Sequence, residues 1–372
     1  MKFEKNRTTT ILLAGLLAIS CTVKFDSSKN QSSLKQAYQK DFYIGAALDE
    51  SQINETDAAT NQLIKSQFNT ITAENIMKCE NIHPQWDTYK FDLADKFVAY
   101  GKKNKMFLVG HTLLWHQQLS PFVKNIKSKD SLQMFIINHI NKVAGRYKGK
   151  IDGWDVVNEA LNEDGTYRKS IFYELLGEDY VVNAFKLAEK AAPGSELYYN
   201  DFNIEQPNKR EGAIKLVTKI KNSGARIDGV GIQGHWSLEH LPLKDIEESI
   251  VAYSKLGLKV MITELDISVL PNPKKLVGAN IEQNFAEDSK MNPYAKELPD
   301  SIQVKLAQRY EDLFKVLIKH QDKISRVTFW GVNDKQSWLN GWPIKNRTNY
   351  PLVFDRNNKG KLGYDKIIAL KK

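Results

Sequence analysis

The segments Trp154-Asp-Val-Val-Asn-Glu159 and Val260-Met-Ile-Thr-Glu264 decide the fold of this chain. Each is a short apolar run that ends at a carboxylate, which is typical of a buried parallel strand whose carboxyl end meets solvent. Asn158 precedes the first glutamate, and Asp266 lies two residues after the second. If both strands belong to one sheet, the two glutamates lie at the same edge and can face each other across one cleft.

Strand-like and helix-like patterns alternate along most of the chain. Strands are predicted at 42–48, 68–73, 106–110, 153–157, 196–199, 229–232, 260–263 and 327–331. Helices are predicted at 58–67, 91–103, 131–146, 180–191, 208–222, 243–256 and 302–320. This alternation predicts an α/β fold, a single (β/α)₈ TIM barrel. The alternative is an open doubly wound sheet, which usually has a glycine-rich phosphate turn after its first strand, and residues 48–51 contain no glycine.

The composition of the chain is that of an ordinary globular protein. Of its 372 residues, 42% are hydrophobic and 26% are charged, and this length allows one large barrel or two medium-sized domains. The formal net charge is +9, but the lysines are dispersed along the chain. Because no nucleic-acid-binding motif accompanies them, we expect no nucleic-acid partner.

The N-terminus has the pattern of an export signal. Lys2, Lys5 and Arg7 precede an apolar run at 11–20, which is too short to span a bilayer and is followed by Cys21. Because this cysteine resembles the acylation site of bacterial lipoproteins, residues 1–21 are predicted to be a lipoprotein-type signal with Cys21 as the lipidated residue. Ordinary secretion and an uncleaved anchor are the alternatives.

The rest of the chain is predicted to divide into a spacer and one domain. Residues 22–39 are polar and aperiodic, which favours a flexible spacer, and residues 40–372 form the barrel domain. We expect an exported monomer in the cell envelope, periplasmic or at the cell surface, that touches a membrane only through its N-terminal lipid. The only other cysteine, Cys79, is expected to be a small buried residue.

Polar and aromatic side chains gather where the predicted strands end, and these ends meet at one rim of a barrel. They include Glu74, Asn75, Lys78, His111, Trp115, Gln118, Asn158, Glu159, Asn200, Gln233, His235, Glu264, Asp266, Trp330 and Trp338. A single glutamate at a strand end is usually a solvated charge or half of an ion pair, but this combination suits a sugar. Polar groups bond the hydroxyls of a sugar, and aromatic rings cover its C–H faces.

No metal or other cofactor is predicted. His111 and His116 are five residues apart, so on a strand their side chains point to opposite faces, and no third ligand follows them. The connection from Leu270 to Pro299 is long for a barrel, and it follows the strand that ends at Glu264. We therefore expect it to face the substrate rather than to mark a domain boundary.

Seven motifs in a fixed order resemble the endo-β-1,4-xylanases of glycoside hydrolase family 10. Ordered similarity runs from about residue 42 to residue 355, and although each motif alone is weak, the order of all seven is specific. The motifs are Phe68-Asn-Thr-Ile-Thr-Ala-Glu74-Asn75-Ile-Met-Lys78, Gly110-His-Thr-Leu-Leu-Trp-His116, Trp154-Asp-Val-Val-Asn-Glu159-Ala160, Tyr199-Asn-Asp-Phe-Asn203, Gly231-Ile-Gln-Gly-His-Trp236, Ile262-Thr-Glu-Leu-Asp266 and Phe329-Trp-Gly-Val-Asn-Asp334.

The resemblance implies endo-hydrolysis of internal β-1,4 bonds in xylan by a retaining double displacement. It implies Glu159 as the acid/base and Glu264 as the nucleophile. Asn158 would bond the 2-hydroxyl of the sugar being cleaved, and His235 would orient Glu264, with Asp266 behind the imidazole.

The resemblance also implies the residues that bind the rest of the substrate, which would be xylan or a xylo-oligosaccharide. Lys78, His111 and Trp115 would line the glycone sugar, and Gln233 would also contact the group formed by Glu264, His235 and Asp266. The others are Glu74, Asn75 and Gln118 one sugar unit further out, Trp330 and Trp338 as an aromatic wall, and Tyr199 and Asn200 on the leaving-group side.

The chemistry makes two demands on the glutamates. The acid must keep its proton near neutral pH, so we expect a raised pKa at Glu159, while Glu264 stays ionised. A retaining site needs carboxylates about 5–5.5 Å apart, whereas an inverting site needs about 6.5–9.5 Å. Two alternatives remain: a glucan or an aryl-glycoside as the preferred substrate, or a glycan-binding protein descended from such a barrel, which would lack one carboxylate.

Overall fold

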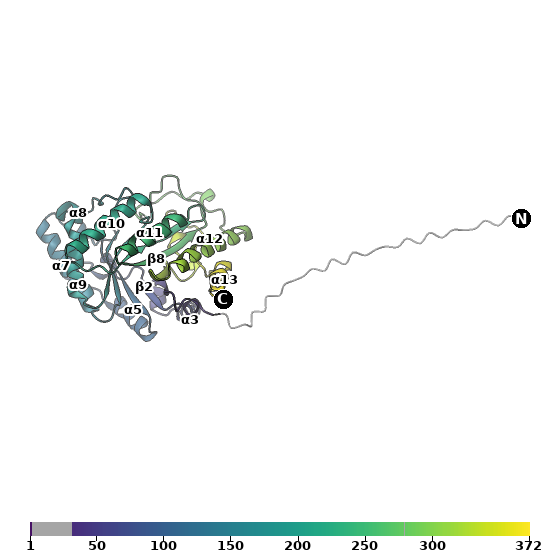
Figure 1. The fold of residues 1–372 in the computed structure, drawn as a ribbon, viewed down its shortest axis with the longest axis horizontal. Coiled ribbons are helices and arrows are strands. Elements are labelled where there is room, and N and C mark those ends of the chain that lie inside the picture. The colour runs from purple at the N-terminus through teal and green to yellow at the C-terminus, as the bar shows by residue number, and fades with distance from the viewer. Residues whose placement is uncertain (2–31, 279) are drawn as a thin grey trace. The chain divides into compact units, whose positions relative to one another are not determined.

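Eight parallel strands close into a barrel (Figure 1). Their order around the ring is β1, β2, β3, β4, β5, β6, β8, β9, and the pairing of β9 with β1 closes it. A short ninth strand, β7, pairs only with the end of β8. The strands are β1 (Tyr43–Leu48), β2 (Thr70–Ala73), β3 (Phe107–Trp115), β4 (Gly153–Asn158), β5 (Glu196–Asp201), β6 (Gly229–Ile232), β7 (His235–Ser237), β8 (Lys259–Ser268) and β9 (Ile324–Phe329).

This computed structural model describes Met1 and residues 32–278 and 280–372. Residues 32–372 form one compact unit. Cys21, nearly all of the predicted signal and residues 22–31 of the predicted spacer lie outside the described residues. Among the helices of the described part, none combines the length and the hydropathy needed to cross a bilayer.

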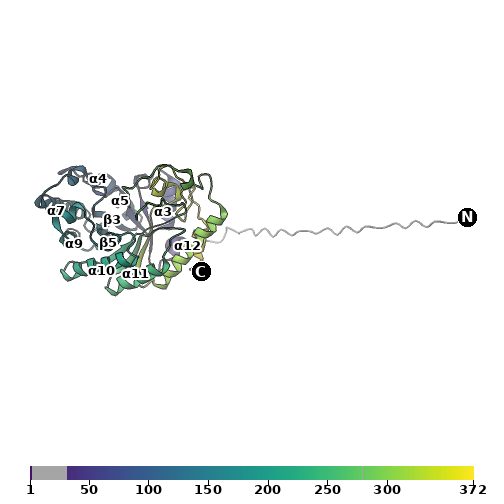
Figure 2. The same cartoon turned by 90° about the horizontal axis from the view of Figure 1, so that it is seen from above.

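Helices surround the strands in both views of the molecule (Figures 1 and 2). The longer ones are α3 (Ala58–Gln67), α5 (Asp92–Lys103), α7 (Lys129–Arg146), α9 (Asp179–Ala191), α10 (Pro207–Asn222), α11 (Leu243–Lys255), α12 (Asp300–Lys319) and α13 (Leu362–Ala369). The short ones are α1 (Leu34–Ala37), α2 (Glu50–Ile53), α4 (Cys79–Ile82), α6 (Pro121–Lys124), α8 (Ile171–Leu176), η1 (Ser289–Met291), η2 (Asp334–Gln336) and η3 (Trp338–Asn340). The predicted (β/α)₈ barrel is confirmed.

Local sequence explains where these helices begin. Helix α5 has Asp92 and Asp95 in its first turn and Lys102 and Lys103 in its last, which complements the helix dipole at both ends. Helix α10 starts at Pro207, whose fixed φ and missing N–H suit the first helical position. The seven predicted helices match the observed ones to within two residues at each end.

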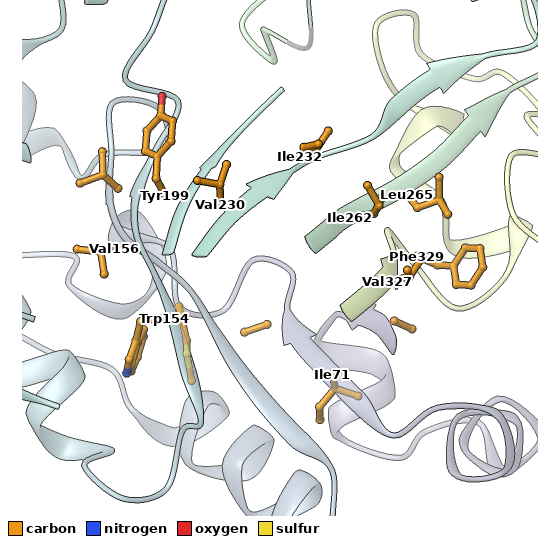
Figure 3. Close-up of a cluster of buried hydrophobic side chains, with 14 of the residues drawn as sticks. Ile71, Trp154, Val156, Tyr199, Val230, Ile232, Ile262, Leu265, Val327 and Phe329 are labelled. Carbon is orange, nitrogen blue, oxygen red and sulfur yellow. The ribbon is translucent and has the colours of Figure 1, made fainter. Parts of the chain in front are cut away.

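The core lies on the outer face of the barrel strands, beneath the helices. Figure 3 shows buried side chains two residues apart on a strand, such as Val230 and Ile232 on β6 and Val327 and Phe329 on β9. Residues at this spacing share one face of a strand. The ring of Phe329 contacts Tyr310 of α12, so this face points toward the helices. The alternate residues therefore point into the barrel.

Strand β8 is longer than predicted. Strand β8 continues through Glu264 and Asp266 to Ser268, and β7, which was not predicted, pairs with its end. The prediction ended the strand at Thr263 because the apolar pattern stops there. The paired backbone nevertheless remains extended, because these polar side chains find hydrogen-bond partners inside the site.

The globular domain begins earlier than the predicted boundary at residue 40. Residues 34–37 form α1, which Ser33 and Gln36 cap reciprocally, and Leu34 and Tyr38 are fully buried. The hydroxyl of Tyr38 donates to the carbonyl of Ile367 in α13 at 2.6 Å. The predicted spacer is thus wrong for residues 33–38, because two apolar side chains four residues apart suffice to dock one helical turn.

Replacing Leu34 with alanine is expected to lower the free energy of unfolding by about 2–5 kcal/mol, since a buried leucine leaves a cavity. Denaturant unfolding of the full chain measures the change, and the exposed Lys40→Ala serves as a matched control. Equal stabilities for the two variants would contradict the assignment of α1 to the core.

Candidate active site

A cavity of about 260 Å³ opens where the strands end. Most of the residues predicted to bind substrate or to act in catalysis line this cavity. They come from six strands and the turns that follow them. Its lining consists of Glu74, Asn75, Lys78, His111, Trp115, Gln118, Asn158, Glu159, Gln233, His235, Glu264, Ile281, Trp330, Trp338 and Trp342. Both glutamates are almost fully buried, at 4% and 5% exposure, so their charges are sparingly solvated.

A chain of amide side chains connects the two glutamates. The Nδ2 of Asn200 donates to Oε1 of Glu264 at 2.8 Å and to Oδ1 of Asn158 at 2.9 Å. Asn158 in turn donates from Nδ2 to Oε1 of Glu159 at 3.3 Å. Because each amide is held by its neighbours, the positions of the two carboxylates depend on each other.

Glu159 is positioned by the backbone and by two further donors. Its φ of +56° lies in the left-handed region, where a residue other than glycine is uncommon and often functional. The indole Nε1 of Trp115 donates to Oε2 at 2.8 Å, and Nε2 of Gln233 donates to Oε1 at 3.0 Å. Burial, followed by the negative charge of Asp201, outweighs these donors and raises the pKa of Glu159.

Glu264 shows the opposite shift. Burial favours the neutral acid, but a hydrogen bond from His235 and the electrostatic effects of His111 and His235 outweigh it and lower the pKa of Glu264. The imidazole of His235 bridges Glu264 Oε2 and Asp266 Oδ2, each at 3.1 Å. Burial alone would lower the pKa of His235, but these two carboxylates raise it to about 10. His235 is therefore an imidazolium at neutral pH and donates to both.

One end of the cavity carries a lysine and polar groups. The ammonium of Lys78 donates to Oδ1 of Asn75 at 2.9 Å and lies 4.9 Å from the centre of the Trp115 ring. Burial raises the pKa of Glu74 to about 7, against the opposing charge of Lys78. Nε2 of Gln118 donates to Glu80 at 2.8 Å. These groups offer several donors and acceptors to a hydroxylated ligand.

Tryptophan side chains also line the cavity. Trp338 stacks on Trp342 with ring centres 4.6 Å apart, and its Nε1 donates to Oδ2 of Asp266 at 2.8 Å. Trp330 packs edge-on against His111, whose Nδ1 lies 2.9 Å from Oδ2 of the buried Asp155. Three tryptophan side chains thus border the carboxylates and can cover the apolar faces of a sugar ring.

Two predicted ligand contacts are corrected by the alternation of side chains along β5. Tyr199 is fully buried, its hydroxyl donates to Asp201 at 2.5 Å, and it does not line the cavity. Asn200 points inward but is also fully buried, behind Glu264, so it supports the carboxylate instead of meeting a leaving group. Adjacent residues on a strand point to opposite faces, so both could not reach the same site.

Two residues of the cavity were missed by the sequence analysis. Trp342 lies four residues after Trp338, outside the recognised motifs, and only its residue type hinted at a role. Ile281 belongs to the long connection expected to face the substrate, and an isolated isoleucine in a loop carries no signal. A second cavity of about 210 Å³ shares His235, Trp338 and Trp342 with the first and is also lined by Phe202, Asn203, Gln206, Trp236, Ser237, His240, Asp266, Ser268, Asn272, Pro273, Leu276, Gly278 and Leu339.

The described residues contain no group of three or more His, Cys, Asp or Glu side chains placed to hold a metal ion. Burial lowers the pKa of His116 to about 3, so its imidazole is neutral at pH 7. Cys79 is free and buried, as predicted.

A barrel whose rim holds one glutamate with a raised pKa and one with a lowered pKa, among tryptophans and hydroxyl-binding groups, has the construction of a glycoside hydrolase. Comparison with known protein families agrees with this class. The profile of glycosyl hydrolase family 10 matches residues 33–370, and the chain belongs to this family.

Relatives match over nearly the whole chain. "Endo-1,4-beta-xylanase A" of Xylanibacter ruminicola is 42% identical over 348 residues, which cover 92% of this chain and 94% of that protein. The solved structure of a GH10 endoxylanase from a sugarcane soil metagenome has a TM-score of 0.87 and 42% identity, covering 92% of this chain and all of that one. A mutant structure in complex with xylotriose has a TM-score of 0.81 and 33% identity, covering 90% of this chain and 99% of that one.

Proposed function

We propose that this glycoside hydrolase is an endo-β-1,4-xylanase that cleaves internal bonds of xylan with retention of anomeric configuration. Glu159 serves as the acid/base and Glu264 as the nucleophile. The single observation that carries this assignment is the opposite pKa shift of two glutamates that line one cavity. Relatives with xylanase names and a neighbour that holds xylotriose support the choice of xylan.

In the first step, a carboxylate oxygen of Glu264 attacks the anomeric carbon of the sugar beside it. The bond from that carbon to the leaving oxygen breaks, and the leaving oxygen takes the proton of Glu159. His235 and Asn200 hold Glu264 by hydrogen bonds, so the nucleophile is already oriented before substrate binds.

In the second step, water replaces the leaving sugar. Glu264 is now bound as an ester and carries no charge. Glu159 has lost its proton in the first step, so it takes a proton from the water while the oxygen of that water attacks the anomeric carbon. The ester bond breaks and Glu264 regains its charge. Two inversions at the same carbon give net retention.

The substrate assignment is tested by mass analysis of the products from glucuronoxylan, with Glu264→Ala and Glu159→Ala assayed in parallel. Short xylo-oligosaccharides from the unsubstituted protein alone would support the proposal. Turnover of β-glucan or of aryl-glycosides without release of products from xylan would indicate a different substrate and the same mechanism. No turnover of any polysaccharide would favour a glycan-binding protein.

The imidazolium of His235 predicts a change in pH dependence. In His235→Gln the positive charge is gone and burial dominates, so the pKa of Glu264 is expected to rise above its ordinary value of 4.5. Glu264 must be ionised to attack. When the pH is lowered, the variant should therefore lose activity at a higher pH than the unsubstituted protein. The profile of kcat/KM against pH measures this acidic limb.

The control for this experiment is His320→Gln, which removes a histidine paired with Glu247 at the end of α12. We expect its acidic limb to coincide with that of the unsubstituted protein. An unmoved limb in His235→Gln would contradict the role of the imidazolium in keeping Glu264 ionised.

We also propose that the protein is exported and anchored through a lipid on Cys21. The basic, apolar and small residues at 2–20 support export, and the position of the cysteine supports acylation. Mass spectrometry of the mature N-terminus tests both: an acylated Cys21 would support the anchor, whereas cleavage without acylation would leave ordinary secretion.

A further inference from the structure

The long connection between β8 and α12 reaches the opposite side of the barrel. In the ring order, β8 and β3 are separated by three strands in either direction. Yet Oδ1 of Asn280, in this connection, accepts a hydrogen bond from Nε2 of Gln117, two residues past the end of β3, at 2.7 Å. The connection therefore spans the mouth of the barrel.

The chain then turns to another wall of the cavity within five residues. The backbone N–H of Phe285 donates to the carbonyl of Pro343 at 3.0 Å, and Phe285 pairs with Ile344 as a parallel bridge. Five residues extend over at most about 18 Å. We call residues 280–285 the bridging segment, since they join the turn after β3 to the turn after β9.

The cavity lies between these two attachments. Trp115 and Trp342 both line it, the first two residues before Gln117 and the second directly before Pro343. Ile281 of the bridging segment lines the same cavity together with Glu159 and Glu264. The segment thus borders the cavity that holds the two carboxylates, and a second cavity shares Trp342 with the first.

The two attachments differ in strength. Near β9 the connection is held by the Phe285 contacts, by Asn346 donating to Glu287 at 2.6 Å, and by the backbone of Thr348 donating to Asn292 at 3.0 Å. Near β3, within the part of the chain that the structure describes, one side-chain hydrogen bond ties Asn280 to Gln117. Among the described residues, buried Oε1 of Gln117 has no hydrogen-bond partner there, and an unpaired buried acceptor is destabilising.

We propose that the bridging segment is a specificity-determining cover, released at the contact between Gln117 and Asn280, that controls whether polymeric substrate reaches the carboxylates. A short xylo-oligosaccharide enters along the cavity beneath the closed cover. The middle of a long chain has no free end at the cavity, so it must enter from the side after the cover opens. The inference rests on the proposed function and specifies which form of xylan the site accepts.

A reducible tether tests the proposal. Gln117→Cys and Asn280→Cys are combined and joined by a short bis-methanethiosulfonate linker, and mass spectrometry verifies the link. We expect the rate on soluble polymeric xylan to fall at least about tenfold, because the competent open state is removed. Hydrolysis of an aryl β-xylobioside should stay within about twofold, and a thiol reductant should restore the polymer rate.

Matched controls isolate the cover. The double variant Glu287→Cys with Asn346→Cys places the same linker at the attachment near β9. Treatment of the unsubstituted protein with the reagent shows whether modification of Cys21 or Cys79 affects activity. Neither should lose polymer activity. In addition, the untethered Gln117→Ala should raise kcat/KM for polymer relative to aryl xylobioside, since it weakens the closed state.

The outcomes separate the two proposals. Equal rates of the tethered and reduced protein on polymer would overturn the cover, as would an equal loss on both substrates. An unsubstituted protein that cleaves neither xylan nor the xylobioside would overturn the proposed function, and the inference would fall with it.

Discussion

Glu264→Ala is expected to lower kcat/KM on xylan by at least about 10⁴-fold, the order of loss seen when a covalent nucleophile is removed. The hydrogen bonds of Glu264 to His235 and Asn200 place a carboxylate that water cannot replace in position or charge. Release of reducing ends measures the loss. Glu239→Ala, which removes an exposed glutamate after β7, should retain full activity.

Azide distinguishes the role of Glu264 from a merely structural one. The small anion can enter the space that the carboxylate leaves and attack the anomeric carbon of an activated aryl β-xylobioside from the same face. Because this is a single displacement, the product should be the α-glycosyl azide. A residual rate within tenfold of the unsubstituted protein, or rescue that yields only the β-azide, would contradict the assignment.

The sequence was sufficient for the barrel because its signal is repeated. Eight predicted strands alternate with seven predicted helices, and an error at one boundary leaves the architecture unchanged. The residues of the site followed from the same logic, since strands of known order must end at one rim. Glu159 and Glu264 line a single cavity, although 105 residues separate them.

What the sequence left open depends on side-chain direction and on loops. Tyr199 and Asn200 are neighbours in one motif, but a strand turns one of them toward the helices and the other into the barrel. Ile281 reaches the cavity only because Asn280 meets Gln117 across the mouth, a contact between residues 163 positions apart. Neither a periodicity nor a motif encodes such a contact.

The opposite pKa shifts also required the structure. From the sequence, both glutamates are strand-end carboxylates with similar flanking residues, and the resemblance alone assigned their roles. In the fold, Glu264 lies beside the His235 imidazolium, whereas the largest effect of a charge on the pKa of Glu159 comes from Asp201. The difference arises from β5 and β7, which contribute Asp201 and His235.

Glu159→Ala is expected to show a loss that depends on the leaving group. On xylan, kcat/KM should fall by at least about 10³-fold, because the leaving oxygen must depart without a proton. On a 2,4-dinitrophenyl β-xylobioside the first step needs no acid and should persist, so the glycosyl–enzyme accumulates and mass spectrometry detects it. Azide, which takes the position of the attacking water, should then give the β-glycosyl azide.

The pH profile of Glu159→Ala tests its role as the acid a second time. In the unsubstituted protein, activity is lost as pH rises through the raised pKa of Glu159, because the proton needed by the leaving group is gone. With Glu159→Ala and the dinitrophenyl substrate, that alkaline loss should disappear, while the acidic limb set by Glu264 remains. An alkaline limb that persists would assign it to another group, and an equal loss of rate on both substrates would contradict the role of Glu159 as the acid.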